Sequence, residues 1–409
     1  MNPLSRRRFL LSSAALTATP LLARLLAEEK KPAADNPIPA ANTSFGCDLY
    51  ARLRAEKGNV FFSPFSIETA LAMTALGAKG NTLIEMQKTL HLPADTTKTS
   101  DGFKTLLATL NGEGKKDRGY ELSVANALWG MKGYPWRDEF LKASKAAFGA
   151  GLEQVDFSNE PVARKTINDW VEEHTNKKIK DLIPSGVLDA DTRMVLTNAV
   201  YFKGTWEVEF DKKLTKDGPF TLADGTKADV PLMHRTDELR YAEGDDWQAV
   251  DLGYKGKETA MTVLLPKKAD RLADLEKKLS PDLLAGIFKG MSRPKVILTL
   301  PRFKTETKYS LREPLESLGM KDAFSGKADL TGMHSSPEKL YISHVLHKAF
   351  VEVNEEGTEA AAATAVVVAK ASAAVDDRPK VFKADRPFLF VIRHTPTNTV
   401  LFAGRFEKP

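Results

Sequence analysis

The chain has 409 residues, of which 42% are hydrophobic and 28% charged, a composition typical of a globular protein. This composition excludes a disordered, collagen-like or polytopic membrane protein. The single cysteine, Cys47, excludes an intrachain disulfide framework and any multi-cysteine metal cluster. Because Cys47 lies in an amphipathic segment, we expect its thiol to be packed rather than reactive.

Residues 1–27 have the pattern of an export signal. Residues 5–10, SRRRFL, precede an apolar stretch that is too short to span a membrane. The pair Arg6–Arg7 resembles the twin-arginine signature of bacterial export, with an ordinary secretory signal or a short anchor as alternatives. Cleavage after Ala23 and cleavage after Ala27 fit equally well. We therefore expect a periplasmic or extracellular protein with no stable membrane span in its mature chain.

Removal of the signal changes the charge balance. Residues 1–27 carry four arginines and no acid, so their loss lowers the formal net charge from +5 to +1. A nearly neutral mature chain gives no support for nucleic-acid binding. Residues 28–41 are polar and contain three prolines, which predicts a flexible lead-in. No later stretch resembles a linker and no long repeat appears, so residues 42–409 are predicted to form one domain.

The predicted elements alternate between helices and strands. Residues 82–92 have apolar side chains at helical spacing, and Thr82 with Glu85 forms a capping-box pattern at their start. A second amphipathic helix is predicted at 162–176. Residues that are apolar on both faces predict a central strand at 194–202. Further strands are predicted at 259–265, 295–300, 388–393 and 399–403. Helices dominate the first half and strands the second, which favours an α+β fold over a regular βαβ alternation.

The sequence carries no recognisable catalytic motif. It lacks a GxSxG elbow, an HExxH helix and a phosphate-binding loop. Of the seven histidines, only His344 and His347 are close together, and their odd spacing in a strand places the two rings on opposite faces. This spacing is poor for a shared metal ion. We predict that the protein is not an enzyme and uses neither a metal nor a cofactor.

Residues 355–371, EEGTEAAAATAVVVAKA, do not fit a single secondary structure. Their alanines favour a helix, whereas Thr364 and residues 366–368 are β-branched and favour a strand. Gly357 would loosen a helix at its start. Small side chains that suit a loop, a helix and a strand indicate a segment that can change conformation.

This segment resembles the reactive-loop hinge of the serpins, and the likeness continues along the chain. Motifs similar to those of the family occupy residues 59–82, 197–206, 342–364 and 385–405, and with the intervening order they cover about residues 42–407. The resemblance implies three β-sheets, eight or nine helices and an exposed reactive-centre loop at about residues 355–380. It also implies a metastable monomer that inhibits serine proteases. As serpin loops are known to do, the loop would form an acyl-enzyme with the target protease and then insert as a new strand.

The resemblance identifies the hinge as Glu355, Glu356, Gly357, Thr358, Glu359, Ala360, Ala361, Ala362, Ala363 and Thr364. Side chains alternate along a strand, so every second residue from Thr358 onward would share the buried face after insertion. Those residues are small or β-branched, and Glu359 falls on the opposite face. Since a buried, unpaired charge is costly, this pattern favours an inhibitor. A non-inhibitory serpin that acts as a binding or carrier protein is the alternative.

The family's usual spacing from Gly357 places the reactive bond at Ala371–Ser372. An alanine before the cleaved bond implies an elastase-like or subtilisin-like serine protease as the target. A shift of one residue would place Lys370 there and favour a trypsin-like protease. Ala369 and Arg378 are the remaining alternatives.

Two polar groups also carry over by resemblance. The shutter, a cluster beneath the point where the central strands part, comprises Ser63, Ser66, Asn198 and His347. A buried hydrogen-bond network that serves stability alone is the alternative reading. The breach, where the loop enters the sheet, comprises Trp206, Arg302 and Glu355. Arg302 stands where many members have lysine, and we expect it to pair with Glu355. The segment 101–112, which corresponds to the basic helix of heparin-responsive members, offers only Lys104, so no glycosaminoglycan activation is expected.

Overall fold

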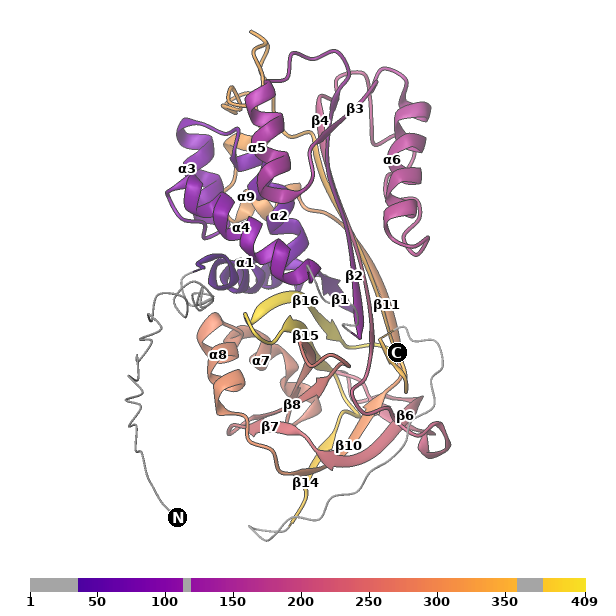
Figure 1. The fold of residues 1–409 in the computed structure, drawn as a ribbon. Helices are drawn as coiled ribbons and strands as arrows, with labels where there is room; N and C mark the ends of the chain where they lie inside the picture. The colour runs from indigo at the N-terminus through magenta and orange to yellow at the C-terminus, as the bar shows by residue number, and fades with distance from the viewer. Residues whose placement is uncertain (1–35, 113–118, 359–377) are drawn as a thin grey trace, which may run out of the picture. The chain divides into compact units, whose positions relative to one another are not determined.

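A computed structural model describes residues 36–112, 119–358 and 378–409. A six-stranded sheet extends through the described part of the molecule and is its longest sheet (Figure 1). In spatial order its strands are β11 (Phe303–Ser310), β12 (His344–Val353), β13 (Gly357–Thr358), β4 (Met194–Thr205), β2 (Tyr120–Met131) and β3 (Leu152–Val155). The predicted export signal, the outer hinge residues Glu359–Thr364 and the candidate reactive residues Ala369, Lys370, Ala371 and Ser372 lie outside the described residues.

Two smaller sheets complete the strand architecture. The first has the order β1 (Val60–Phe62), β16 (Thr399–Phe406), β15 (Phe388–His394), β9 (Thr259–Pro266), β8 (Trp247–Gly253) and β7 (Arg240–Glu243). The second has the order β14 (Lys380–Lys383), β10 (Lys295–Pro301), β6 (Lys227–Glu238) and β5 (Lys216–Thr221). Because β14 directly follows the loop region, this second sheet anchors the far end of the loop.

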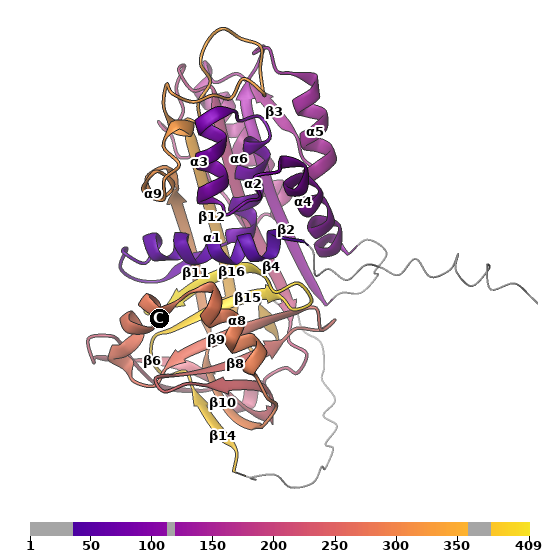
Figure 2. The same ribbon diagram turned by 90° about the vertical axis from the view of Figure 1, so that its left-hand side faces the viewer.

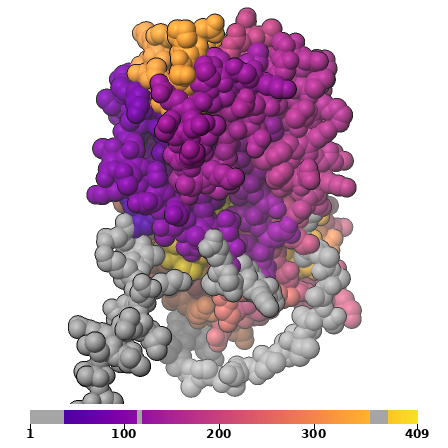
Figure 3. Space-filling view, turned by 45° about the horizontal axis from the view of Figure 1, so that its top comes forward, coloured from indigo at the N-terminus to yellow at the C-terminus, as the bar shows by residue number. Residues whose placement is uncertain are grey.

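The described residues form nine α-helices, and most of them cover one face of the long sheet (Figures 1 and 2). On that face lie α2 (Pro64–Ala75), α3 (Gly80–Thr89), α4 (Thr96–Asn111), α5 (Asp138–Phe148) and α9 (Arg312–Ser317), and α6 (Glu160–His174) covers the other. The remaining helices, α1 (Ile38–Leu53), α7 (Leu272–Lys278) and α8 (Pro281–Gly290), pack near the first small sheet. In the space-filling view, residues of the first half of the chain, coloured indigo to magenta, form most of the upper part of the visible face (Figure 3). This arrangement confirms the predicted α+β class.

All the predicted helices and strands are present, but two details of the prediction were wrong. Thr82 and Glu85 lie inside α3, whose N-cap is Lys79, and do not form a capping box. Instead, Thr82 Oγ1 accepts a hydrogen bond from the Asp329 amide at 2.9 Å, and Glu85 accepts bonds from the amides of Lys321 and Asp322. Tertiary contacts therefore use both side chains.

The second correction concerns the predicted lead-in at 28–41. Helix α1 begins at Ile38, inside that range, and Ile38 and Ala41 are already buried in the core. Pro39 lies in the first turn, where its missing amide hydrogen is not needed. The proline-rich composition that predicted a linker is thus compatible with a helix start.

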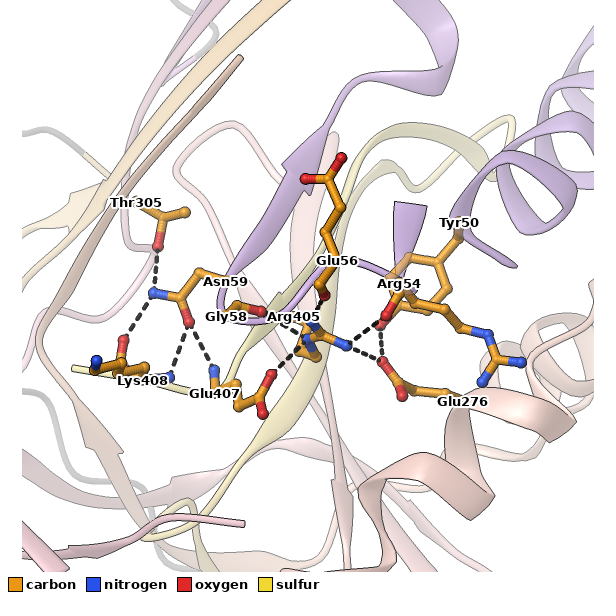
Figure 4. A network of polar contacts seen from close by, with 10 residues as sticks. All are labelled: Tyr50, Arg54, Glu56, Gly58, Asn59, Glu276, Thr305, Arg405, Glu407 and Lys408. Carbon is orange, nitrogen blue, oxygen red and sulfur yellow. Dashed lines mark hydrogen bonds and ion pairs between the residues drawn. The ribbon is translucent and has the colours of Figure 1, made fainter. Parts of the chain in front are cut away.

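The C-terminal strand is held by an extensive polar network around Arg405 (Figure 4). The Arg405 guanidinium donates to backbone carbonyls of Arg54, Glu56 and Gly58, and pairs with Glu276 at 3.0 Å. Tyr50 Oη donates to the same Glu276 carboxylate. Because Arg405 and Glu276 are both nearly fully buried, the pair is stabilised by these additional hydrogen bonds.

Glu68 is an unusual member of the core. It lies on α2, is fully buried, and neither of its carboxylate oxygens has a hydrogen-bond partner in the described part of the chain. Burial raises the pKa of Glu68 well above 4.5, and the nearby Asn42 amide offsets this effect only in part. An unpaired ionisable group in this position lowers the stability of the native state.

We expect the substitution Glu68→Gln to raise the thermal unfolding midpoint, because it removes a buried group that would ionise. Because the pKa of Glu68 is higher in the folded than in the unfolded state, protonated Glu68 favours folding at low pH. This contribution to the free energy of unfolding is lost as the pH rises through the folded-state pKa. The difference in unfolding midpoint between the variant and the wild type should therefore grow from pH 5 to pH 8 in differential scanning calorimetry. Glu313→Gln at an exposed position of α9 is the control, and an equal midpoint shift in both variants would contradict this account.

Candidate functional site

The long sheet is partly opened at one end, between β12 and β4. These strands pair directly in parallel over seven residue pairs, from His344 with Val195 to Phe350 with Tyr201. Beyond Phe350 the short strand β13 lies between them and is antiparallel to both, with Thr358 opposite Val353 and Gly204. The first residues of the predicted loop are thus already part of the sheet.

Thr358 is fixed at the tip of this inserted segment. It is fully buried, and its hydroxyl lies 2.6 Å from the hydroxyl of Tyr254. Tyr254 in turn stacks on Trp206 with a centroid distance of 4.5 Å. At Gly357 a Cβ atom would lie 2.0 Å from the Gly204 carbonyl oxygen, so only glycine allows the strand to approach so closely.

The turn before β13 is held by backbone and side-chain hydrogen bonds. Trp206 Nε1 donates to the Asn354 carbonyl at 2.9 Å, and the Trp206 amide donates to the Glu356 carbonyl. The Asn354 side-chain oxygen accepts from the amides of Glu356 and Gly357 at 3.0 and 3.2 Å. Trp206 therefore holds the hinge through two of its own nitrogen atoms.

The breach residues Arg302 and Glu355 are in contact. Arg302 Nε lies 2.7 and 2.8 Å from the two carboxylate oxygens, and Nη2 lies 2.5 Å from Oε1. Although burial opposes ionisation of Glu355, hydrogen bonds from Arg302 and Thr215 lower its pKa. Lys212 pairs with the neighbouring Glu356, and this carboxylate raises the pKa of Lys212. Two ion pairs thus anchor the start of the loop.

The four shutter residues also come together, in the region where β12 and β4 are paired. The Ser63 amide donates to His347 Nε2 at 3.2 Å, and the Ser66 amide donates to Ser63 Oγ at 3.1 Å. His347 Nδ1 contacts the side-chain oxygen of Asn198, its register partner on β4. All four residues are fully buried. Separation of β12 from β4 would break the contact between His347 and Asn198.

The sequence prediction missed Asn126, which links the shutter to β2. Asn126 is the register partner of Asn198, and its side-chain oxygen accepts hydrogen bonds from both Asn198 and Ser66. Its amide nitrogen donates to the Ser66 carbonyl at 2.9 Å. A single polar residue within the apolar run 124–130 was the available signal. Tyr254, Thr215 and Asn354 were missed as well.

We expect the buried imidazole of His347 to make stability fall in acid. Burial lowers the pKa of His347 to about 3, so the folded state holds the ring neutral. The unfolded chain binds a proton near pH 6.5, and stability should therefore decrease as the pH falls from 6.5 toward 3. Replacement of His347 by Gln should reduce this slope in urea unfolding measured across that range. An unchanged slope would contradict the assignment.

These side chains suit a sheet that opens. The described residues contain no group of three His, Cys, Asp or Glu side chains that could hold a metal ion. Cys47 is buried, and burial is the main cause that raises its pKa to about 12, so its thiol stays protonated. No helix of the described segments is long and apolar enough to cross a membrane. The geometry defines a central sheet in which the short strand β13 lies between the ends of β12 and β4.

The family model described as Serpin (serine protease inhibitor) matches residues 40–409, and the chain belongs to the serpin family. The leukocyte elastase inhibitor of Bos taurus is 42% identical over 383 residues, which cover 91% of this chain and 99% of the relative. Among solved structures, Serpin48 of the insect Tenebrio molitor has a TM-score of 0.82 and 33% identity, covering 92% and 99% of the two chains. Human thyroxine-binding globulin in complex with thyroxine has a TM-score of 0.83 and 29% identity, covering 91% and 99% of the two chains.

Proposed function

We propose that this serpin is a suicide-substrate inhibitor of serine proteases that traps the acyl-enzyme by inserting its cleaved loop. The observation that carries the proposal is the position of Gly357 and Thr358 between β12 and β4. A strand that has already begun in the correct place needs only to be extended. A relative named as an elastase inhibitor supports the same activity.

The register of β13 supports insertion in a definite alignment. If the strand continues antiparallel to both neighbours, Thr364 comes opposite Asn198 of β4 and His347 of β12. The last residue of the predicted hinge would therefore lie between the two shutter residues that now contact each other. Its hydroxyl can both donate and accept a hydrogen bond, so it can serve both side chains.

Insertion would also increase the number of backbone hydrogen bonds. At present β12 and β4 share one parallel ladder of seven residue pairs. A complete new strand would replace that ladder with two antiparallel ladders, one on each side, and each net hydrogen bond contributes about 0.5–1.5 kcal/mol. The inserted state is thus favoured once cleavage releases the loop.

For the target we propose an elastase-like or subtilisin-like protease cleaving at Ala371–Ser372, with a trypsin-like protease at Lys370 as the alternative. Incubation with subtilisin, pancreatic elastase and trypsin should give a complex of summed mass that survives SDS. Mass spectrometry of the released C-terminal peptide identifies the bond, because it starts at Ser372 in the first case and at Ala371 in the second. Loop cleavage by all three proteases with no complex would favour a binding or carrier role.

We also propose that the protein is exported before it meets its target. The proposal rests on the basic and apolar pattern of residues 1–27. N-terminal sequencing of the protein from the periplasm or medium of an expressing bacterium should give a mature chain that starts after Ala23 or Ala27. Full retention in the cytoplasm with Met1 intact would contradict it.

A further inference from the structure

Helix α2 connects the two halves of the long sheet that would separate when a strand is inserted. At its N-cap, the Ser63 amide donates to His347 of β12. Three residues later, Ser66 Oγ donates to the Asn126 side chain of β2 at 2.7 Å, and the Asn126 amide donates back to the Ser66 carbonyl. The strands β12 and β2 lie on opposite sides of β13. Opening of the sheet must therefore move the start of α2 or break one of these contacts.

Glu68, two residues after Ser66, lies at the contact of α2 with two further elements. Helix α2 packs on α1 and on β16. The side-chain amide of Asn42 on α1 lowers the pKa of Glu68, which burial raises, so the two side chains face each other. Asn42 Oδ1 accepts a hydrogen bond from the Val400 amide of β16 at 3.0 Å. Asn42 is thus held by β16, and Glu68 reports how closely α2 packs on both neighbours.

Three buried polar atoms at this contact are unpaired in the described part of the chain. They are the two carboxylate oxygens of Glu68 and Nδ2 of Asn42. Both side chains are fully buried. Most buried polar atoms in native proteins have a hydrogen-bond partner, and each exception calls for an explanation. A shift of α2 relative to α1 would give these atoms partners, because it would admit water or align the Asn42 amide with the carboxylate.

We propose that protonation of Glu68 controls how readily the long sheet opens to admit a strand. While the carboxyl group is protonated it is neutral, and α2 stays packed on α1. Once ionised, the carboxylate is stable only if water or a hydrogen-bond donor reaches it, so α2 must leave its packed position. This movement displaces Ser63 and Ser66 and weakens the connection between the two halves of the sheet. The inference rests on the proposed function, because it concerns the regulation of the same insertion.

The buried, uncharged titratable groups around α2 do not change their state between pH 6 and pH 9. Burial lowers the pKa of His347 to about 3, so its ring is neutral. Burial is the main cause that raises the pKa values of Cys47 on α1 and Tyr201 on β4 to about 12, and it raises the pKa of Tyr50 on α1 well above 10. These three groups therefore stay protonated.

No charged side chain on the elements that pack on α2 contributes to the pKa of Glu68, for which burial and Asn42 are the causes. The remaining charged or titratable side chains of these elements are Asp48 and Arg52 on α1, Glu85 and Lys88 on α3, Asp138, Glu139, Lys142 and Lys145 on α5, Tyr120 and Glu121 on β2, Lys203 on β4 and Arg405 on β16. A pH dependence of sheet opening between pH 6 and pH 9 can thus be assigned to Glu68.

Uptake of a synthetic peptide by the full chain tests this control without a protease. A fluorescently labelled peptide with the sequence of residues 358–371 should replace β13 between β12 and β4, and its fluorescence anisotropy measures the rate. In the wild type this rate should rise from pH 6 to pH 9 by up to about tenfold per pH unit, the limit for release of one proton. Glu68→Gln cannot ionise and should keep, at every pH, the slow rate that the wild type shows at pH 6.

Three further variants separate ionisation from packing. Glu68→Asp keeps a carboxyl group and should keep the rise with pH, although its side chain is shorter. Asn42→Ala removes the amide that lowers the pKa of Glu68, so the rise should occur at higher pH. Glu313→Gln removes an exposed carboxyl group from α9 and should behave as wild type. Calorimetric unfolding midpoints at the same pH values identify any variant whose rate changes through a general loss of stability.

A wild-type rate that does not change with pH would overturn the proposal, and so would an equal rise in the wild type and in Glu68→Gln. Absence of peptide uptake at every pH would also overturn it. The proposed function has a separate measurement, the complex with a protease that survives SDS. If complexes form but uptake does not depend on Glu68, only the control by Glu68 is wrong. If uptake depends on Glu68 but no protease is trapped, only the proposed inhibitory function fails.

Discussion

Replacement of Thr358 by Arg should convert the proposed inhibitor into a substrate. Thr358 is fully buried between Val353 and Gly204 and bonded to Tyr254, so an arginine there would place an unpaired cation in the core. Such a group costs several kcal/mol, more than the short strand β13 can offset. Cleavage of the variant loop should give no SDS-stable complex and none of the gain in heat stability that the cleaved wild type should show.

Two milder variants separate insertion from general damage. Thr358→Ser keeps the hydroxyl for Tyr254 and should retain complex formation, whereas Tyr254→Phe removes one hydrogen bond worth about 0.5–1.5 kcal/mol. The intact Thr358→Arg protein should keep its overall circular dichroism spectrum, because only the two residues of β13 must leave the sheet. Full inhibition by Thr358→Arg would rule out loop insertion as the mechanism.

Removal of the Arg302 guanidinium should release the start of the loop. Glu355 is 2% exposed and Arg302 is 43% exposed, so Arg302→Met would leave a carboxylate in the interior with Thr215 as its remaining side-chain hydrogen-bond partner among the described residues. Loss of one member of a fully buried pair costs about 3–5 kcal/mol, and the exposure of Arg302 reduces this to about 1–3 kcal/mol. Urea unfolding should show the loss, and the double variant Arg302→Met/Glu355→Gln should recover most of it.

The same pair has a pH signature. Because the pKa of Glu355 is lowered in the folded state, the pair stabilises the protein above pH 4.5 and this contribution is lost as the pH falls below that value. In Arg302→Met, the effect of burial on Glu355 dominates and raises its pKa. The slope of the free energy of unfolding against pH should therefore reverse its sign near pH 4.5. Arg302→Lys keeps the charge without the two-oxygen contact and should give an intermediate result. Identical pH profiles for all three proteins would contradict a stabilising role for the pair.

Sequence patterns predicted the elements whose cause is local. Residues 194–202 are apolar on both faces, and β4 is indeed a central strand with covered faces on both sides. The sequence pattern failed where a side chain forms its hydrogen bonds with a segment that is distant in sequence. Thr82 and Glu85 have the spacing of a capping box. Yet the Asp329 amide donates to Thr82, and the amides of Lys321 and Asp322 donate to Glu85. No local pattern indicates such partners.

The polar residues of the site were also predicted only in part. Resemblance to a family identified residues such as Asn198 and His347, which the structure brings into contact. Asn126 was missed because one polar side chain in an apolar strand has no periodic signal, and Tyr254 was missed because it lies just beyond the end of β8. Their partners, Ser66 and Thr358, are 60 and 104 residues away in sequence. Only the pairing register of the strands reveals that they belong to the site.

The network around Arg405 determines what becomes of the chain after the loop is cut. The part that follows the loop supplies β14, β15 and β16, and both β15 and β16 have a strand on each side. Arg405 additionally fastens β16 to the segment 54–58 and to Glu276. A protein cut in the loop should therefore remain one particle in gel filtration, and its two polypeptides should separate only after denaturation.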